Sequence, residues 1–206
     1  MNQQVQKKLV VATTNAGKAR EIRHALQHLP VEILSLQDFP PLTEAVEDAN
    51  TFMGNAEKKA RHYGAATKCA VIADDSGLCV EALGNAPGVY SARYAGEQAT
   101  DAENNAKLIR ELKAHGCTSS PAFYACAMFF LDVDGTIIQT TGKCTGEIRL
   151  QSRGTGGFGY DPYFYILQGN EKGKTMAELS LAEKEAISHR GAALHAFVAR
   201  LEAYWR

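Results

Sequence analysis

An Asp-Gly pair between two long stretches rich in apolar residues, Asp134-Gly135, constrains the fold of this chain more than any other feature. Asp-Gly between apolar runs favours a two-residue turn whose twist matches that of paired strands. Residues 122–133 and 136–148 are therefore expected to form long, partly buried antiparallel strands. The aromatic residues of the first stretch are assigned to the core rather than to a ligand: Phe123, Tyr124, Phe129 and Phe130.

An apolar run over residues 8–13 predicts a strand near the N-terminus, followed by small residues and then a helix, since apolar residues recur at helical spacing over 22–29. A helix start after such a run can bind phosphate, because it offers backbone N–H groups and Lys18 adds a positive charge. The spacing is not that of a Walker A loop, and a capped turn without a ligand is the alternative. The candidate phosphate-binding residues are Thr13, Thr14, Asn15, Ala16, Gly17 and Lys18.

A second strand over 31–36 and an acidic loop that begins at Pro40-Pro41 precede the next helix. This helix is expected to begin after Asn50 or Thr51, because apolar residues recur at helical spacing over 52–63. The loop carries Glu44, Glu47 and Asp48, and the helix carries Asn55 and Lys59. Acids just before a helix favour its dipole whatever the function, so position alone assigns no role to Glu47.

Two adjacent carboxylates, Asp74 and Asp75, follow an apolar strand at residues 70–73 and precede a turn signal at Ser76-Gly77. Neighbouring side chains of a strand point to opposite faces, so the turn is expected to bend the chain and direct one carboxylate into a site. The other would anchor the loop or share a metal. Adjacent acids repel each other unless a proton or a hard cation such as Mg²⁺ offsets the charge. A solvated turn is the alternative.

A polar helix over residues 101–113, opened by Thr100, precedes the predicted hairpin, and a glycine-rich loop over 154–162 follows it. Four glycines in residues 154–159 surround Phe158, with Tyr160 and Asp161 next to them. Such density lets backbone approach a ligand closely, and an aromatic ring there can stack on a planar base. A flexible hairpin tip is the alternative.

The C-terminal segment begins with a capping-box sequence, Ser180 to Glu183, and is expected to be one helix to about Tyr204. Lys184, His189 and Arg190 lie in its first turns, and Gly191 marks a kink or a close approach. A His-Arg pair on a helix is usually a surface feature. Three such groups in a chain of nearly zero net charge would suit an anionic ligand.

Composition excludes several classes of protein. The 206 residues carry a net charge of -1, which argues against a general nucleic-acid or membrane-surface binder. The five cysteines are odd in number and contain no C-x-x-C pair, so reduced thiols and a cytosolic location are expected. A polar N-terminus with a short apolar run is unlike a signal peptide, and no segment approaches a membrane span.

Six motif blocks, taken together and in order, resemble the inosine triphosphate pyrophosphatase family, the Ham1-like triphosphatases that act on non-standard purine nucleotides. The resemblance covers residues 8–200. The blocks are Thr13-x-Asn15-x-x-Lys18, Phe52-x-x-Asn55-Ala56-x-x-Lys59-Ala60, Ala73-Asp74-Asp75-Ser76-Gly77-Leu78, Ala86-Pro87-Gly88-Val89-Tyr90-Ser91-Ala92-Arg93-Tyr94, Gly157-Phe158-Gly159-Tyr160-Asp161-Pro162 and Ser188-His189-Arg190-Gly191.

The resemblance implies an α/β fold in which helices flank a long twisted mixed β-sheet, as one domain over residues 1–206 with two lobes and a central cleft. It also implies a cytoplasmic homodimer. The implied reaction is Mg²⁺-dependent hydrolysis of ITP, dITP and XTP to the monophosphate and pyrophosphate, which removes deaminated purines from the nucleotide pool. A base with a 6-oxo group and no 2-amino group would be accepted, and ATP and GTP rejected.

Residue roles follow from the same resemblance. Asp75 would accept a proton from the attacking water and lie by the metal, and Glu47 would be a Mg²⁺ ligand. Residues 13–18 would hold phosphates, with Lys18, Lys59 or Arg190 neutralising charge. The remaining nucleotide-binding residues would be Ser76, Phe158, Gly159, Tyr160, Asp161, Lys184, His189 and Arg190, with Phe158 on the base.

The chain departs from the family pattern near Glu47. Asp48-Ala49 follows Glu47 where the family usually has a small residue and Gly, and Gly54 replaces a frequent acid. Two other functions remain open. One is a Maf-like pyrophosphatase for other modified nucleotides, against which the glycine-rich loop and His189-Arg190 argue. The other is a nucleotide sensor without catalysis, which the presence of both Glu47 and Asp75 disfavours.

Overall fold

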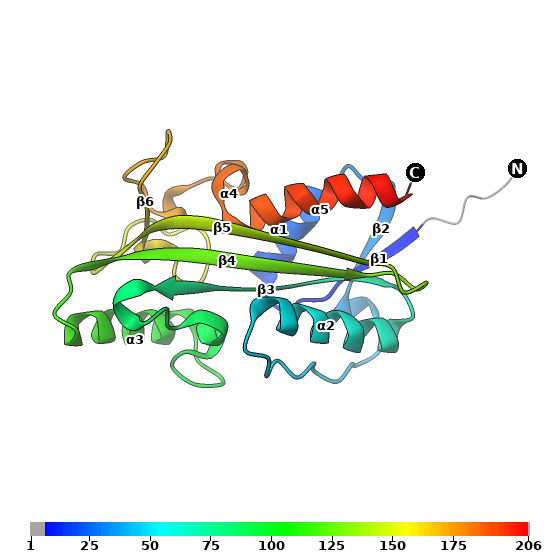
Figure 1. Ribbon diagram of the computed structural model, residues 1–206, viewed down its shortest axis with the longest axis horizontal. Coiled ribbons are helices and arrows are strands. Elements are labelled where there is room, and N and C mark those ends of the chain that lie inside the picture. The colour runs from blue at the N-terminus through cyan, green and yellow to red at the C-terminus, as the bar shows by residue number, and fades with distance from the viewer. Residues whose placement is uncertain (1–6, 206) are drawn as a thin grey trace, which may run out of the picture. The chain divides into compact units, whose positions relative to one another are not determined.

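A six-stranded mixed sheet with strand order β2-β1-β3-β4-β5-β6 organises the computed structural model, which describes residues 7–205 (Figure 1). The polar N-terminal residues 1–6 lie outside the described part. The strands are β1 (Lys7–Val11), β2 (Val31–Ser35), β3 (Ala70–Val80), β4 (Ser119–Leu131), β5 (Ile137–Arg149) and β6 (Phe164–Ile166). The α-helices are α1 (Ala16–Leu26), α2 (Phe52–Thr67), α3 (Asp101–Ala114), α4 (Leu181–Ile187) and α5 (His189–Trp205).

The sheet is mixed because β1 pairs in parallel with both β2 and β3, whereas β5 and β6 are antiparallel. The expected α/β class with a mixed sheet and flanking helices is confirmed. The chain divides into two compact units, and the prediction of one two-lobed domain stays a prediction. Within the described residues, unit 1 comprises 7–75, 127–141 and 193–205, and unit 2 comprises 76–126 and 142–192.

Unit 1 has helices on both faces of its strands, as two neighbouring residues of β4 show. Phe129 is buried with apolar residues of α2, whereas the ring of Phe130 lies 5.8 Å from that of Phe197 on α5. Successive side chains of a strand project to opposite faces, so α2 and α5 cover opposite faces here (Figure 1). Burial of such aromatic side chains contributes most of the packing energy of a core.

Unit 2 has its own core, formed where α3 packs on the strands. Leu108 and Leu112, one helical turn apart on α3, are fully buried in one cluster with Leu78 of β3 and Phe164 of β6. Thr100 caps α3 and, together with Glu103, forms a capping box. Among residues 7–205, none of the helices combines the length and apolar character needed to span a bilayer.

Several sequence predictions are confirmed. The hairpin at Asp134-Gly135 joins β4 to β5, although its loop has three residues, 133–135, rather than two: the Asp132 N–H donates to the Thr136 carbonyl over 2.9 Å, and Gly135 has a φ of 91°. The helix expected after Thr51 is α2, in which the Thr51 side chain accepts the Gly54 N–H. The helix expected over residues 101–113 is α3.

Two predictions are wrong. The chain does not turn at Ser76-Gly77, because β3 continues without interruption from Ala70 to Val80. The C-terminal segment is not one helix, because Ser188 has extended backbone between α4 and α5. Its side chain accepts the Gly191 N–H over 3.0 Å and so satisfies a backbone donor at the start of α5. The short strand β6 was not predicted at all.

Candidate active site

The candidate phosphate site in unit 1 lies at the start of α1. Asn15 is the N-cap residue, and its side-chain oxygen accepts the Lys18 N–H over 3.0 Å. The helix begins at Ala16, so Ala16 and Gly17 are part of its first turn rather than of a loop. Asn15 thus occupies the Lys18 N–H, and the earlier backbone N–H groups of the turn, which have no acceptor within the helix, can bind an anion.

The two adjacent carboxylates of β3 have different partners. The Asp74 carboxylate lies 3.3 Å from the Lys18 ammonium of α1, and the Asp75 carboxylate accepts the Asn55 amide of α2 over 3.0 Å. This difference is what an uninterrupted strand produces, because adjacent side chains project to opposite faces. Asp74 is fully buried and Asp75 is 7% exposed. Both acids are therefore buried on a continuous strand, which contradicts the expected bend and the alternative of a solvated turn.

Lys59 supplies the positive charge for these acids. Its ammonium lies 2.9 Å from the Glu47 carboxylate, and the residue is buried. Burial alone would lower the pKa of Lys59, but the negative charges of Asp74, Asp75 and Glu47 outweigh that effect and raise it. Lys59 thus remains a cation among three carboxylates.

Asp75 is more basic than an ordinary aspartate. Burial raises its pKa above the usual value and the charge of Glu47 adds to this, although Lys59, Lys18 and the Asn55 hydrogen bond act in the opposite direction. A carboxylate with a raised pKa accepts a proton more readily than a solvated one. This property suits a group that activates water.

The loop that carries Glu47 is fixed to Asp75 by one side chain. The Asn55 side-chain oxygen accepts the Ala49 N–H over 2.9 Å, while its amide donates to Asp75. The two departures from the family pattern lie against each other at this point. A Cβ added at Gly54 would lie 2.8 Å from the Cβ of Ala49, so the methyl group of Ala49 occupies the space that Gly54 leaves.

The second cluster, in unit 2, is organised around the buried carboxylate of Asp161. One carboxylate oxygen accepts the Phe158 N–H over 3.0 Å and the Lys184 ammonium over 2.6 Å. The other oxygen accepts the Tyr124 hydroxyl over 3.3 Å. Burial, followed by the charge of Asp161, raises the pKa of Tyr124 well above its usual value, so the hydroxyl is protonated and donates.

The ring of Phe158 faces two cations. The Lys184 ammonium lies 4.4 Å from the ring centre and the Arg190 guanidinium lies 5.6 Å from it. Arg190 is 1% exposed and donates to the Ser76 hydroxyl over 2.7 Å. His189 stacks on the ring of Tyr124, with 4.7 Å between centroids and 12° between planes. We refer to Phe158, Asp161, Lys184, His189 and Arg190 as the Phe158 cluster.

Glycines of the loop are required by contacts within the chain. A Cβ at Gly157 would lie 2.2 Å from the Asp161 carboxylate, and a Cβ at Gly154 would lie 2.6 Å from the Ala177 backbone. Gly191 has the same kind of role, because its Cβ would lie 1.7 Å from the Glu185 carbonyl oxygen. The predicted close approach at Gly191 is therefore confirmed, with backbone as the neighbour.

The structure places the sequence-predicted site residues in two groups. Unit 1 holds Thr13, Thr14, Asn15, Ala16, Gly17, Lys18, Glu47, Lys59 and Asp75, and unit 2 holds Ser76, Phe158, Gly159, Tyr160, Asp161, Lys184, His189 and Arg190. Sequence reasoning assigned Tyr124 to the core and gave no role to Asn55. A hydroxyl in a buried, otherwise apolar strand was the available signal for Tyr124, because such a group needs a partner.

Within residues 7–205 there is no cluster of three or more His, Cys, Asp or Glu side chains placed to hold a metal ion. The donors near Lys59 nevertheless fit Mg²⁺. Glu47 and Asp75 supply hard carboxylate oxygens whose charges act on each other. Mg²⁺ is commonly bound through one or two carboxylates together with substrate phosphates and water.

Buried carboxylates and ammonium groups beside a helix N-terminus, on a mixed sheet flanked by helices, define an α/β protein built to bind an anionic ligand. Comparison with known proteins is more specific, since the model of the Ham1 family matches residues 9–200. The chain belongs to the Ham1 family.

Curated relatives support this membership. The chain is 50% identical over 187 residues to the dITP/XTP pyrophosphatase of Geobacter sulfurreducens, covering 91% of this chain and 92% of the relative. It is 47% identical over 188 residues to the dITP/XTP pyrophosphatase of Geobacillus kaustophilus, covering 91% of each. Among solved structures, a HAM1 protein from Coxiella burnetii has a TM-score of 0.84 at 38% identity, covering 96% of this chain and 100% of that protein.

Proposed function

We propose that this chain hydrolyses deaminated purine nucleoside triphosphates, ITP, dITP and XTP, to the monophosphate and pyrophosphate. One observation carries the proposal: Asp75 is a buried carboxylate of raised pKa that lies among cations and the Asn55 amide. It occurs in a chain about half identical to dITP/XTP pyrophosphatases. The reaction breaks the anhydride bond between the α- and β-phosphorus and adds water across it.

The residues of unit 1 would act on the triphosphate. Asp75 takes the proton of the attacking water, for which its raised pKa suits it. The first-turn N–H groups of α1 and the ammonium groups of Lys18 and Lys59 bind phosphate oxygens and offset the negative charge of the leaving pyrophosphate. Asn55 keeps the Asp75 carboxylate oriented through its 3.0 Å hydrogen bond.

Glu47 and Asp75 are the residues that would hold Mg²⁺. Bound there, the ion would lower the pKa of water and neutralise phosphate charge. The binding of Lys59 to Glu47 keeps that carboxylate near Asp75 before substrate arrives. Ala49 and Gly54, the two departures from the family pattern near Glu47, fit each other, because the Ala49 methyl group occupies the space that Gly54 leaves.

The Phe158 cluster would read the base. The aromatic ring of Phe158 offers a stacking surface, and Lys184, His189 and Arg190 are hydrogen-bond donors in their charged forms. Asp161, the carboxylate of the cluster, already accepts from Phe158, Lys184 and Tyr124. Donors in excess favour a base rich in acceptors, such as the 6-oxo group of hypoxanthine or xanthine. The amino groups of adenine and guanine would find no comparable acceptor.

The chain is further proposed to act in the cytoplasm as a homodimer. The free cysteines at positions 69, 79, 117, 126 and 144 suit a reducing compartment. The homodimer is proposed on family resemblance. Light scattering coupled to size-exclusion chromatography tests it, and a mass of one chain at micromolar concentration contradicts it.

A panel of ITP, dITP, XTP, GTP, ATP and CTP, assayed for pyrophosphate release with Mg²⁺ and with EDTA, tests the function. We expect fast, Mg²⁺-dependent release from the first three and slow release from the rest. Asp75→Asn should reduce turnover by about 10³-fold, within the usual range for a general base. Equal rates on all six nucleotides would refute the assigned selectivity, and no release from any of them would refute the reaction.

A further inference from the structure

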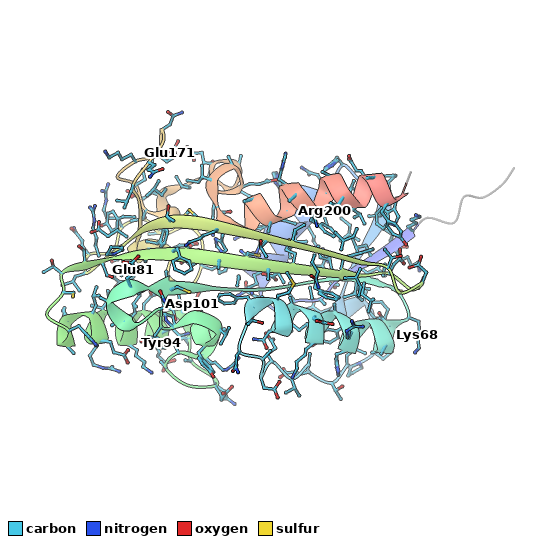
Figure 2. All side chains as sticks on the ribbon, viewed as in Figure 1. Lys68, Glu81, Tyr94, Asp101, Glu171 and Arg200 are labelled. Carbon is cyan, nitrogen blue, oxygen red and sulfur yellow. The ribbon has the colours of Figure 1, made fainter. Side chains whose placement is uncertain are left out.

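Two side chains of α3, one helical turn apart, contact both polar groups of a single loop residue. The Gly159 N–H donates to the Asp101 carboxylate over 2.6 Å, and the Asn105 amide donates to the Gly159 carbonyl over 2.8 Å. Residues four apart on a helix lie on the same face, so one face of α3 binds both the N–H and the carbonyl of Gly159. Asp101 is labelled at the start of the helix in Figure 2.

Gly159 lies between residues that are also fixed. The Phe158 N–H donates to Asp161, and the Tyr160 hydroxyl donates to the Ser91 carbonyl over 2.7 Å. A Cβ at Gly159 would meet no atom within 4 Å, so the space on that side of the residue is open. Asp101 and Asn105 bind its backbone through two hydrogen bonds, one to the N–H and one to the carbonyl.

Burial of the Asn105 side chain destabilises the fold unless its hydrogen bond to Gly159 offsets the cost. The residue is 9% exposed, and its side-chain oxygen has no hydrogen-bond partner among residues 7–205. A buried polar atom without a partner destabilises the folded state. Leu108 and Leu112 show that α3 packs on this core through apolar side chains. An apolar residue at 105 would therefore serve packing better, and the bond to Gly159 is the gain that offsets the cost.

We infer that Asp101 and Asn105 are positioning residues for base recognition. By fixing the backbone of Gly159, they fix the adjoining Phe158, whose ring faces Lys184 and Arg190. The inference rests on the proposed function, because it assigns to α3 the precision with which the base is read. Neither residue is expected to touch the nucleotide.

Four variants separate positioning from a general loss of structure. Asp101→Ala removes the acceptor of the Gly159 N–H, whereas Asp101→Asn keeps an oxygen acceptor of the same size. Asn105→Asp replaces the donor by a carboxylate of nearly identical shape. Glu103→Ala is the matched control, because it weakens the capping box of the same helix turn without a contact to Gly159.

Two measurements are made on each variant: kcat and KM for XTP and GTP, and hydrogen exchange of the Gly159 amide. We expect Asp101→Ala and Asn105→Asp each to lower kcat/KM for XTP about tenfold, the usual effect of one hydrogen bond. The kcat/KM for GTP should change less than twofold, since its base is already poorly read. Asp101→Asn and Glu103→Ala should stay within twofold of the wild type for the ratio of XTP to GTP. The Gly159 amide should exchange faster in Asp101→Ala only.

The inference would be overturned if Asp101→Ala and Asn105→Asp lowered kcat/KM equally for XTP and GTP. It would also be overturned if Asp101→Asn failed to restore the ratio of kcat/KM for XTP to that for GTP. Unchanged exchange of the Gly159 amide in Asp101→Ala would overturn it as well. A wild-type protein that hydrolyses neither nucleotide would instead refute the proposed function, so the two failures are distinguishable.

Discussion

Asn55 donates from its side-chain amide to the Asp75 carboxylate over 3.0 Å and accepts the N–H of Ala49 through its side-chain oxygen. Both polar ends of one buried amide are thus satisfied, one by β3 and one by the loop that carries Glu47. The amide orients the proposed base and fixes the proposed metal-binding loop with the same side chain.

Asn55→Asp tests this relationship, because the carboxylate keeps the acceptor for Ala49 and replaces the donor to Asp75 by a negative charge. A like charge at this distance raises the pKa of Asp75 further. Asp75 must be ionised to accept a proton, so the acidic limb of the pH profile of kcat/KM should move to higher pH. A pH-rate profile with XTP measures the shift. An unchanged limb would contradict the assignment of Asp75 as the base.

Asp75→Asn should stabilise the fold at neutral pH, even as it removes activity. Burial raises the pKa of Asp75 in the folded protein, so ionisation opposes folding. The stability of the wild type therefore falls as the pH rises from the ordinary aspartate value of about 4 through the raised pKa. Asparagine does not ionise, so the gain in Tm should be largest above the raised pKa and vanish at acid pH. Thermal unfolding from pH 3 to pH 8 in EDTA measures it, and a gain independent of pH would contradict this account.

Gly54 and Ala49 should behave as a coupled pair. In Gly54→Ala the new Cβ lies 2.8 Å from that of Ala49, and overpacking of this kind costs about 1–3 kcal/mol. Ala49→Gly removes the contact with Ala49 but leaves the Thr51 hydroxyl 3.0 Å from the new Cβ, so the double variant should recover part of that loss. Urea unfolding of the four proteins gives the coupling free energy. Additive effects of the two substitutions would show that the loop moves freely enough to absorb the methyl group.

Local sequence signals predicted the elements whose cause is local. The Asp134-Gly135 hairpin, the capped helices α2 and α3, and the strand near the N-terminus each follow from turn chemistry or periodicity. The turn signal at Ser76-Gly77 failed because strand pairing overrides it: a residue pair that favours a turn in isolation lies within β3. The prediction of one helix across Ser188 failed because helical periodicity continues in the sequence, whereas the Ser188 side chain accepts a backbone N–H of the next helix.

The candidate site was predictable where a motif carries it and not where only a contact does. Asp75, Lys18 and Arg190 lie in motif blocks, whereas Tyr124 and Asn105 act through residues far away in sequence. No periodicity shows that an aromatic residue of a buried strand donates to Asp161. The raised pKa of Asp75 also depends on burial, which emerges only when the helices and sheet are assembled.

Tyr124 is expected to contribute mainly through its ring. The hydroxyl donates to Asp161 over 3.3 Å, which is long for an O–H···O hydrogen bond, and Asp161 also accepts from Lys184 at 2.6 Å. The ring, by contrast, stacks on His189 and lies 4.6 Å from that of Phe164. Tyr124→Phe should therefore lower kcat/KM for XTP less than about threefold and the free energy of unfolding by about 1 kcal/mol.

Tyr124→Leu removes the stack as well and should lower kcat/KM by more than about tenfold, because the His189 ring loses the surface that sets its plane. Both variants lose the hydroxyl, so the difference between them isolates the ring. Tm measured on both proteins separates this effect from a general loss of stability, since a large-to-small substitution in a core costs about 2–5 kcal/mol. If Tyr124→Phe lowers kcat/KM as much as Tyr124→Leu does, base recognition depends on the hydrogen bond from the hydroxyl to Asp161 rather than on the stack on His189.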